Sequence, residues 1–256
     1  FQYKVPWECP FIKYNTRLFN NKYVYTNMPI FQNKHIEILK KKDSFVLNIK
    51  QTENNKKASQ FWEKTCSLID YQKKTKLQIQ FDADSIETLP SLLKTKKKKL
   101  SYRHCELFFK NFLSQIKSLE KDGLGIVNLD LNDFIIINKE GTRYDSCIIF
   151  INVEKFHKLE NNHFNLKKPS QISKLIGSKF VSPEVKNIKD IPAKIHKKTI
   201  FYSIAKLITF CINDEHKLDE KAGYELSLES ISESKLYYGL MRCIENNPHE
   251  RYYLYI

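Results

Sequence analysis

The sequence predicts an α+β protein with two parts, a small β-rich part with one helix and a larger, mainly helical part. Three observations support this fold class. Hydrophobic residues make up 41% of the 256 residues and aromatic residues 13%, which is enough apolar material for a sizeable core. Alternation of apolar and polar residues dominates the beginning of the chain, whereas apolar residues spaced three and four apart dominate the remainder. All six glycines follow residue 122.

In the first part, β-branched and aromatic residues alternate with polar ones in several short segments, a pattern typical of strands. One segment instead repeats apolar residues at helical spacing, from Ala58 to Ile69. The predicted elements are strands at 22–27 and 44–50, an amphipathic helix at 56–70, a strand at 77–81 and a short helix at 85–93. The segment 35–42 favours no single type of element.

In the second part, apolar stripes predict three helices, and two apolar segments predict strands that form a hairpin with Gly141 in its turn. The predicted elements are a helix at 101–121, strands within 125–138 and at 146–153, and helices at 198–213 and 234–245, with polar connections at 154–178 and 214–232. The division between the parts falls near 82–100. We place it between residues 93 and 94, so that 1–93 holds an N-terminal extension and the β-rich lobe and 94–256 the helical lobe.

The chain is strongly basic, with 43 Lys and Arg against 29 Asp and Glu and a net charge of +14. A basic protein favours acidic partners, such as nucleic acid, an anionic membrane surface or an acidic protein. Solvated lysines, in a composition inherited from an AT-rich genome, account for the charge equally well. Lys outnumbers Arg, whereas specific nucleic-acid sites depend on Arg. We therefore expect a protein partner of acidic character, with nucleic acid as the alternative.

The basic run Lys96, Lys97, Lys98 and Lys99 is predicted as an exposed loop that is either solvated or a contact for a partner. No run of 18 apolar residues occurs, so no membrane span is expected. The six cysteines form no CxxC pair and are expected to be reduced, in the cytoplasm or nucleus. The chain begins at Phe1 without a signal-peptide pattern and is expected to be a fragment. Its composition suits a protist parasite, a microsporidian or a large DNA virus.

Five segments of the second part carry motif-like patterns in a fixed order along the chain. They are NLDLNDFI at 128–135, NVE at 152–154, GSKFVSPE at 177–184, TIFYSIA at 199–205 and LYYGLMRCIENNPHER at 236–251. In this order they resemble the catalytic loop, the DFG motif, the segment ending in APE, the buried large-lobe helix and the C-terminal PxxR turn of the protein kinase superfamily. The resemblance covers roughly residues 20–256 and implies a protein-kinase-like two-lobed fold.

The resemblance implies roles for residues of the second part. Asp130 aligns with the catalytic base of the HRD motif. Asn152 aligns with the magnesium-binding Asp of DFG, and Ile135 aligns with the metal-binding Asn of the catalytic loop. Glu184 and Arg251 align with the structural ion pair between the APE segment and the PxxR turn. From the residues alone, Asp130 could equally cap its own loop through backbone N–H groups.

A shorter resemblance extends into the first part. FVLNIK at 45–50 resembles the VAIK motif, which makes Lys50 the phosphate-contacting lysine and Glu63, on the following helix, its ion-pair partner. Taken as a strand residue alone, Lys50 could equally be solvated. No glycine occurs within 26–42, where the family has its glycine-rich loop.

These departures from the family pattern imply a loss of phosphoryl transfer. Mg²⁺ prefers charged oxygen ligands, but Ile135 offers no oxygen and Asn152 offers no charge. A loop without glycine cannot bring its backbone N–H groups close to phosphates. The resemblance therefore predicts a pseudokinase with a degenerate nucleotide site at Lys50, Glu63 and Asn152. No cofactor is expected, although metal-independent ATP binding stays open.

The resemblance predicts a protein-binding scaffold or an allosteric subunit of a larger assembly. Two alternatives stay open: an atypical active Ser/Thr protein kinase that uses Asp130 and Lys50, and a basic subunit associated with nucleic acid or ribonucleoprotein. Phosphate transfer that depends on Asp130 would indicate the first, and steep salt dependence of RNA or DNA binding the second. The seven histidines form no HxxxH or HExxH pattern, and His157 and His163 are expected in a solvated loop.

Overall fold

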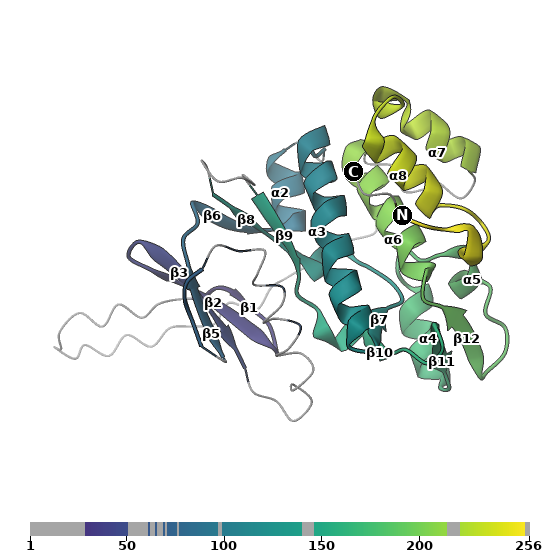
Figure 1. The fold of residues 1–256 in the computed structure, drawn as a ribbon, viewed down its shortest axis with the longest axis horizontal. Helices are drawn as coiled ribbons and strands as arrows, with labels where there is room; N and C mark the ends of the chain where they lie inside the picture. The colour runs from purple at the N-terminus through teal and green to yellow at the C-terminus, as the bar shows by residue number, and fades with distance from the viewer. Residues whose placement is uncertain are drawn as a thin grey trace, which may run out of the picture.

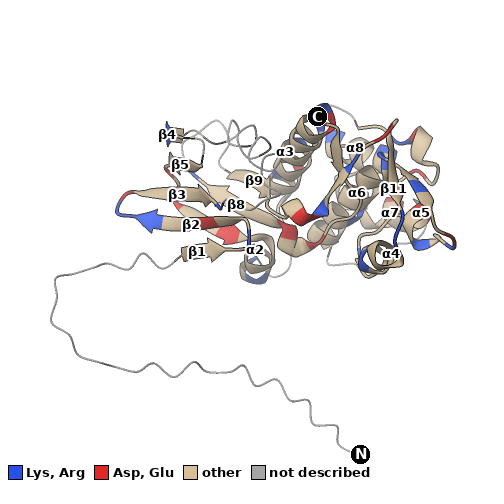
Figure 2. Ribbon diagram, turned by 90° about the horizontal axis from the view of Figure 1, so that it is seen from below, with Lys and Arg blue, Asp and Glu red and all other residues tan. Residues whose placement is uncertain are grey.

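The computed structural model describes residues 29–50, 61, 65, 69, 71–75, 77–96, 99–139, 146–213 and 221–253. The fold is mixed α+β, as the sequence predicts. A β-sheet lies at one end of the molecule and most helices lie toward the other (Figure 1). Lys and Arg are spread over both ends (Figure 2). Within the described residues, no helix combines the length and the apolar character needed to cross a membrane.

The sheet at the end of the molecule has five antiparallel strands. Across the sheet the order is β1 (Pro29–Gln32), β2 (Ile36–Lys41), β3 (Ser44–Ile49), β5 (Gln78–Phe81) and β4 (Tyr71–Lys74). The central strand β3 is buried at five of its six positions because it has a partner on each side. Its buried β-branched, aliphatic and aromatic side chains suit a strand that is covered on both faces.

Most predictions for this part can be compared with the sheet. The predicted strands at 44–50 and 77–81 are confirmed, and the ambiguous segment 35–42 contains β2. The predicted strand at 22–27 and most of the predicted helix at 56–70 lie outside the described residues. Strand alternation is a local pattern, so it identifies β3 and β5 without knowledge of their partners.

Residues 85–93 contain a strand followed by a helix, so the prediction of a single helix is wrong. β6 (Ser85–Thr88) pairs with β8 (Phe134–Asn138), and α2 (Leu89–Thr95) follows it. The Thr88 hydroxyl accepts a hydrogen bond from the Ser91 N–H, which makes Thr88 the helix cap. The chain therefore leaves the five-stranded sheet at 82–84, before the predicted division at 93 and 94.

The long helix α3 (Tyr102–Lys121) packs against the hairpin of β8 and β9 (Ser146–Phe150), and both predictions are confirmed. Phe112 meets Phe134 edge-on, with ring centroids 5.4 Å apart. The buried Gln115 amide donates to the Ile148 carbonyl and accepts from the Phe150 N–H, each at 2.9 Å. Because β9 is an edge strand, Gln115 satisfies backbone groups that no further strand reaches.

Three short elements lie within the predicted polar connection at 154–178, so that prediction is wrong. They are β10 (Phe156–Lys158), β11 (His163–Leu166) and α4 (Pro169–Ile176). β10 pairs with β7 (Leu124–Ile126), β11 pairs with β12 (Ala193–His196), and α5 (Pro183–Lys186) follows α4. His157 lies in β10 and His163 in β11, not in a solvated loop. Gly125 is needed in β7 because a Cβ there would lie 2.7 Å from the Phe164 ring.

Three helices complete the second part: α6 (Thr199–Asn213), α7 (Lys221–Ser227) and α8 (Lys235–Cys243). The predicted helices at 198–213 and 234–245 are confirmed. Every residue of α6 from Thr199 to Cys211 is buried, which places this helix at the centre of the core.

The thiol of Cys105, in α3, is also buried, and its pKa is raised to about 12 because burial disfavours the thiolate.

The predicted ion pair between Glu184 and Arg251 is present. Arg251 is fully buried, and its guanidinium donates to both carboxylate oxygens of Glu184 at 2.5 and 2.9 Å. It also donates to the carbonyls of Glu245 and Asn246 and lies over the Tyr202 ring at 5.1 Å. One side chain thus joins α5, α6 and the C-terminal turn.

Replacing Glu184 with Gln should lower the free energy of unfolding by about 3 kcal/mol, because it leaves a buried guanidinium without a counter-charge. Urea unfolding measures the change. Glu120→Gln is the matched control, since it breaks the half-buried pair with Lys197 (2.8 Å) and should cost about 1 kcal/mol or less. Equal losses in the two variants would contradict the structural role of Arg251.

The loss of stability in Glu184→Gln should also depend on pH. Burial alone would raise the pKa of Glu184, but the hydrogen bonds and charge of Arg251 outweigh it and hold the pKa below its ordinary value. A carboxylate with a depressed folded-state pKa stabilises the protein at neutral pH and loses that contribution as the pH falls through the folded-state pKa. The difference between the wild type and Glu184→Gln should therefore shrink below about pH 4.3.

Candidate functional site

A cavity of about 480 Å³ opens between the loop before β8, the segment after β9 and the end of α4; we call it the Asp130 cavity. Its walls include Asn128, Asp130, Asn152, Lys155, His157 and Lys174. The segment after α4 closes one side, because the Ser178 hydroxyl donates to the Leu129 carbonyl at 2.6 Å. The cavity therefore brings together Asp130 and Asn152, which the sequence analysis proposed as one site.

Asp130 borders this cavity, but its carboxylate is used locally. It accepts hydrogen bonds from the backbone N–H and the side-chain amide of Asn132, at 3.2 and 3.3 Å. Asp130 is the N-cap of a short 3₁₀ helix formed by residues 131–133. The structure thus contains the capping role that the sequence analysis weighed against a catalytic one.

Asp133 is the centre of the polar contacts behind the cavity. Its side chain is only 2% exposed. One carboxylate oxygen accepts from the Asp130 N–H and from the Lys155 ammonium, both at 2.6 Å, and the other accepts from the Asn152 amide at 2.8 Å. Burial raises the pKa of Asp133, and the charge and hydrogen bond of Lys155 oppose that rise. Lys155 is therefore the counter-ion that keeps this carboxylate in the interior.

Ile135, which the sequence alignment placed at the position of the metal-binding Asn, lies elsewhere in the structure. Ile135 lies inside β8, where it is fully buried and paired with Ile149 and Thr88, so it does not reach the cavity. Asp133, just before β8, lies beside Asn152 instead. The HRDLxxxN pattern places its Asn five residues after its Asp, whereas β8 here begins only four residues after Asp130. The sequence analysis missed Asp133 and Lys155, although the apolar run after Asp133 marks the strand.

The turn between β1 and β2 lies directly against the segment that holds Asn152. The Asn33 carboxamide oxygen accepts from the N–H groups of residues 35 and 36, which makes the turn tight. The Asn33 amide also donates to the Ile151 carbonyl at 3.3 Å. Lys34 and His35 contact Glu154 at 3.2 and 3.6 Å, and the hydrogen bond from Lys34 lowers the pKa of Glu154. Three contacts thus join the five-stranded sheet to the site.

Lys50 follows β3, and its ammonium donates to the Asn33 carbonyl at 3.0 Å. Since Asn33 also bonds to Ile151, Lys50 lies two contacts away from the segment of Asn152. Glu63 lies outside the described residues, so its pair with Lys50 stays a prediction.

Of the predicted basic run, Lys96 and Lys99 are described, and neither is among the residues that line the Asp130 cavity. Lys96 ends α2 and Lys99 follows in an exposed turn, closed by a hydrogen bond of 3.2 Å from the Lys99 N–H to the Lys96 carbonyl. Lys97 and Lys98 lie outside the described residues. Leu100, next in the chain, donates its N–H to the Cys211 carbonyl at 2.7 Å, which places the run beside the end of α6.

The described part of the chain contains no group of three or more His, Cys, Asp or Glu side chains placed to hold a metal ion. No protein-family model matches the sequence, and no curated protein matches it either. The chemistry of the Asp130 cavity therefore has to be argued from its own geometry. The buried carboxylate behind the cavity, Asp133, is neutralised by Lys155, and the Asp130 and Glu154 carboxylates on its wall contact Asn132 and Lys34.

Replacing Lys155 with Met should lower the free energy of unfolding by about 3 kcal/mol, because it leaves the Asp133 carboxylate buried without a counter-ion. The same change made in an Asp133→Asn background should cost less than about 1 kcal/mol, since no charge is then left behind. Chemical denaturation of the four proteins of this cycle measures the coupling.

The control for this cycle is Lys110→Met, which removes an ion pair of 3.0 Å with Glu106 on the same face of α3. That pair is more exposed, so its loss should cost about 0.5 kcal/mol. If Lys155→Met costs the same in both Asp133 backgrounds, Lys155 is not the counter-ion of Asp133.

Proposed function

We propose that this chain is a degenerate kinase-like domain, a pseudokinase, which acts by binding a protein partner and does not transfer phosphate. The order of its elements supports the kinase-like part of this proposal. An antiparallel sheet comes first, then a long helix, a hairpin flanked by polar residues, the Glu184 segment, a buried helix and the turn of Arg251. The five-stranded sheet corresponds to the small lobe, and the helical part corresponds to the large lobe.

The pairing of Asp133 with Lys155 is the observation that carries the inactive assignment. In active kinases, magnesium is held by an Asn that precedes the hairpin and an Asp that follows it. In this chain the two side-chain types are exchanged, with Asp133 before β8 and Asn152 after β9. The ammonium of Lys155 lies 2.6 Å from the carboxylate and supplies the positive charge that a metal would bring. Phosphoryl transfer depends on positioning and charge neutralisation by the metal, so this arrangement disfavours it.

The turn of residues 33–35 supports the same conclusion for nucleotide binding. It corresponds to the glycine-rich loop, yet it has no glycine, and the backbone N–H groups of residues 35 and 36 are bonded to Asn33. Those groups cannot form a cradle for phosphates. The contacts of the turn with Ile151 and Glu154 also close the space beneath it. We therefore propose that the domain binds neither magnesium nor nucleotide.

A domain of this kind can still bind a protein partner. The fold keeps its buried ion pair and its core, so it presents a stable surface without the catalytic chemistry. The net charge of +14 favours an acidic protein as the partner.

Thermal unfolding with ATP, in the presence and absence of Mg²⁺ or Mn²⁺, tests this proposal. We expect no shift in either condition, and no transfer of the γ-phosphate of ATP to the chain or to a generic protein substrate. A ligand of the native state at ten times its Kd would add about 1.4 kcal/mol of stability, which such a titration resolves. Transfer that disappears in Asp130→Ala would overturn the proposal.

A double variant that is expected to respond to Mg²⁺ serves as the positive control for the absence of a shift in the wild type. In Asn152→Asp combined with Lys155→Ala, the ammonium is removed and a second carboxylate stands beside Asp133. We expect this double variant to gain Mg²⁺-dependent stabilisation that the wild type lacks, because two carboxylates can share one hard cation. Equal Mg²⁺ responses in both proteins would contradict the role assigned to Lys155.

A further inference from the structure

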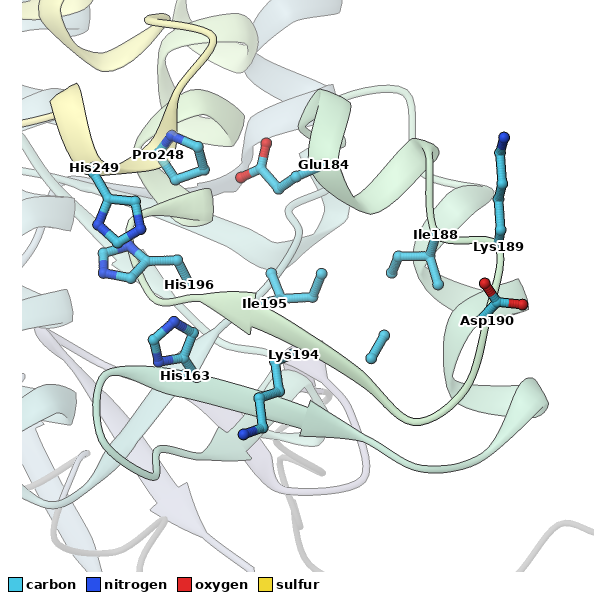
Figure 3. A pocket seen from close by; sticks show the side chains of 11 residues that line it. His163, Glu184, Ile188, Lys189, Asp190, Lys194, Ile195, His196, Pro248 and His249 are labelled. Atoms are coloured by element: carbon cyan, nitrogen blue, oxygen red, sulfur yellow. The ribbon is translucent and has the colours of Figure 1, made fainter.

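A second cavity, of about 390 Å³, shares no lining residue with the Asp130 cavity; we call it the histidine cavity (Figure 3). Its walls come from the paired strands β11 and β12, from α5 and the loop after it, and from the C-terminal turn at residues 248–250. His163, His196 and His249 lie one above the other along one side, as Figure 3 shows. Neither the charge pattern nor the motifs of the sequence indicated this site, because the three histidines come from three separate segments.

The paired strands β11 and β12 build one wall of the cavity. His163 lies opposite His196, and Asn165 lies opposite Lys194, so all four side chains share one face of the two strands. Ala193 and Ile195 alternate with Lys194 and His196 along β12 and also line the cavity. The wall therefore combines a row of polar and cationic side chains with apolar ones.

The three imidazole rings are close neighbours. The ring centroids of His163 and His196 are 5.2 Å apart, and those of His196 and His249 are 4.5 Å apart. His196 Nδ1 accepts a hydrogen bond from the Lys198 N–H at 3.3 Å, so the proton of the neutral ring is on Nε2. His163 Nδ1 donates to the Asn161 carbonyl at 2.7 Å. These bonds fix the orientation of two of the rings.

Positive charge exceeds negative charge around this cavity. The cationic and titratable groups on it or next to it are Lys189, Lys194, Lys197, Lys198, His163, His196 and His249. The carboxylates nearby are Asp190 on the loop, Glu184 on α5, Glu160 before β11, Glu250 beside His249, and Glu120, which pairs with Lys197 at 2.8 Å. Glu184 is fully engaged by Arg251, and Glu160 by Lys158 and Asn165. Among the described residues, neither Lys189 nor Lys194 forms an ion pair.

The lowered pKa of His196 is consistent with the excess of positive charge around this cavity. Partial burial, the largest cause, and the neighbouring His249, His163, Lys198 and Lys197 together lower the pKa of His196 to about 4. A protonated imidazole in this cavity therefore lies among more cations than anions, since Glu184 is bonded to Arg251 and Asp190 is the other carboxylate of the lining. An anion that entered the cavity would remove that penalty and would bind more tightly as the pH falls.

We propose that the histidine cavity binds a phosphate-class anion, either free inorganic phosphate or a phosphate group carried on a partner. Imidazole N–H groups and lysine ammonium groups donate to the anion oxygens, and their charges neutralise it. A metal ion fits the site less well, because no group of described His, Cys, Asp or Glu side chains converges on one point. The proposal uses no feature of the kinase resemblance and stands or falls independently of the proposed function.

Inorganic phosphate is the first probe. In a titration at pH 6.5 and constant ionic strength, phosphate should shift the imidazole ¹H–¹³C resonances of His163, His196 and His249, assigned through single His→Gln variants. It should also raise the apparent pKa of His196 by at least one unit from its value of about 4. Because the anion favours the protonated imidazole, phosphate affinity should rise as the pH falls from 6 towards the pKa of His196 at about 4.

Variants at the exposed lysines separate this site from general charge attraction. Lys194→Gln should weaken phosphate binding at least fivefold without loss of stability, because its side chain is exposed and unpaired in the described structure. Lys41→Gln, an exposed lysine at the end of β2, should leave binding unchanged. Imidazole resonances that do not move, equal weakening in both variants, or tighter binding of Zn²⁺ than of phosphate would overturn the proposal.

A phosphoserine peptide distinguishes the two sources of the anion. Binding at least tenfold tighter than that of inorganic phosphate, and lost in Lys194→Gln, would assign the cavity to a phosphorylated partner. Equal affinity for the two probes would assign it to the free anion. In both cases the unphosphorylated peptide should not bind, and its binding with equal strength would refute a phosphate site.

Discussion

The buried guanidinium of Arg251 is the constraint on which the second half of the structure depends. A charge with no exposure to water must have a counter-charge nearby, and Glu184 supplies it through two hydrogen bonds. That requirement fixes α5 against the C-terminal turn. The chain before α5 then contacts Leu129 through Ser178 and forms a wall of the Asp130 cavity. The chain after α5 forms a wall of the histidine cavity, so one ion pair positions both.

The two cavities differ in how their charges are satisfied. Behind the Asp130 cavity, the Asp133 carboxylate has three donors from the protein itself, one of them the Lys155 ammonium. The β1–β2 turn adds further contacts to the same segment through Glu154. Around the histidine cavity, Lys197 pairs with Glu120, but Lys189 and Lys194 form no ion pair among the described residues. A site that satisfies its own charges gains little from a ligand, whereas a site with unbalanced charge gains much.

The fold was largely predictable where a pattern is long and local. The apolar stripe of α3, the uniformly apolar α6 and the alternation of β3 each extend over enough residues to define an element. The strands β10, β11 and β12 have three or four residues each, and they exist because of pairing with distant segments. The hydrophobic periodicity of such short segments does not reveal these strands. The same holds for the division of residues 85–93, which is set by the pairing of β6 with β8.

The candidate site was predictable only in part, for a related reason. Asp130 and Asn152 were found because they stand in recognisable motifs, and the pair of Glu184 and Arg251 followed from the same alignment. Asp133 was missed because the loop before β8 is shorter than the family pattern, which shifted the alignment onto Ile135. The histidine cavity was missed because spatial proximity of three separate segments leaves no trace in sequence spacing.

The exchange of Asp and Asn around the β8–β9 hairpin and the presence of Lys155 depend on one another. Asp133 lies at the end of a capped turn, where the Asp130 N–H holds it in the interior. A carboxylate at that depth requires a cation, and the 3₁₀ helix of residues 153–155 brings the Lys155 ammonium to it. Losing the lysine alone strands the carboxylate, and losing the carboxylate alone strands the lysine. Under the proposed kinase-like function, a metal site would therefore need at least two coordinated changes, one at Asn152 and one at Lys155.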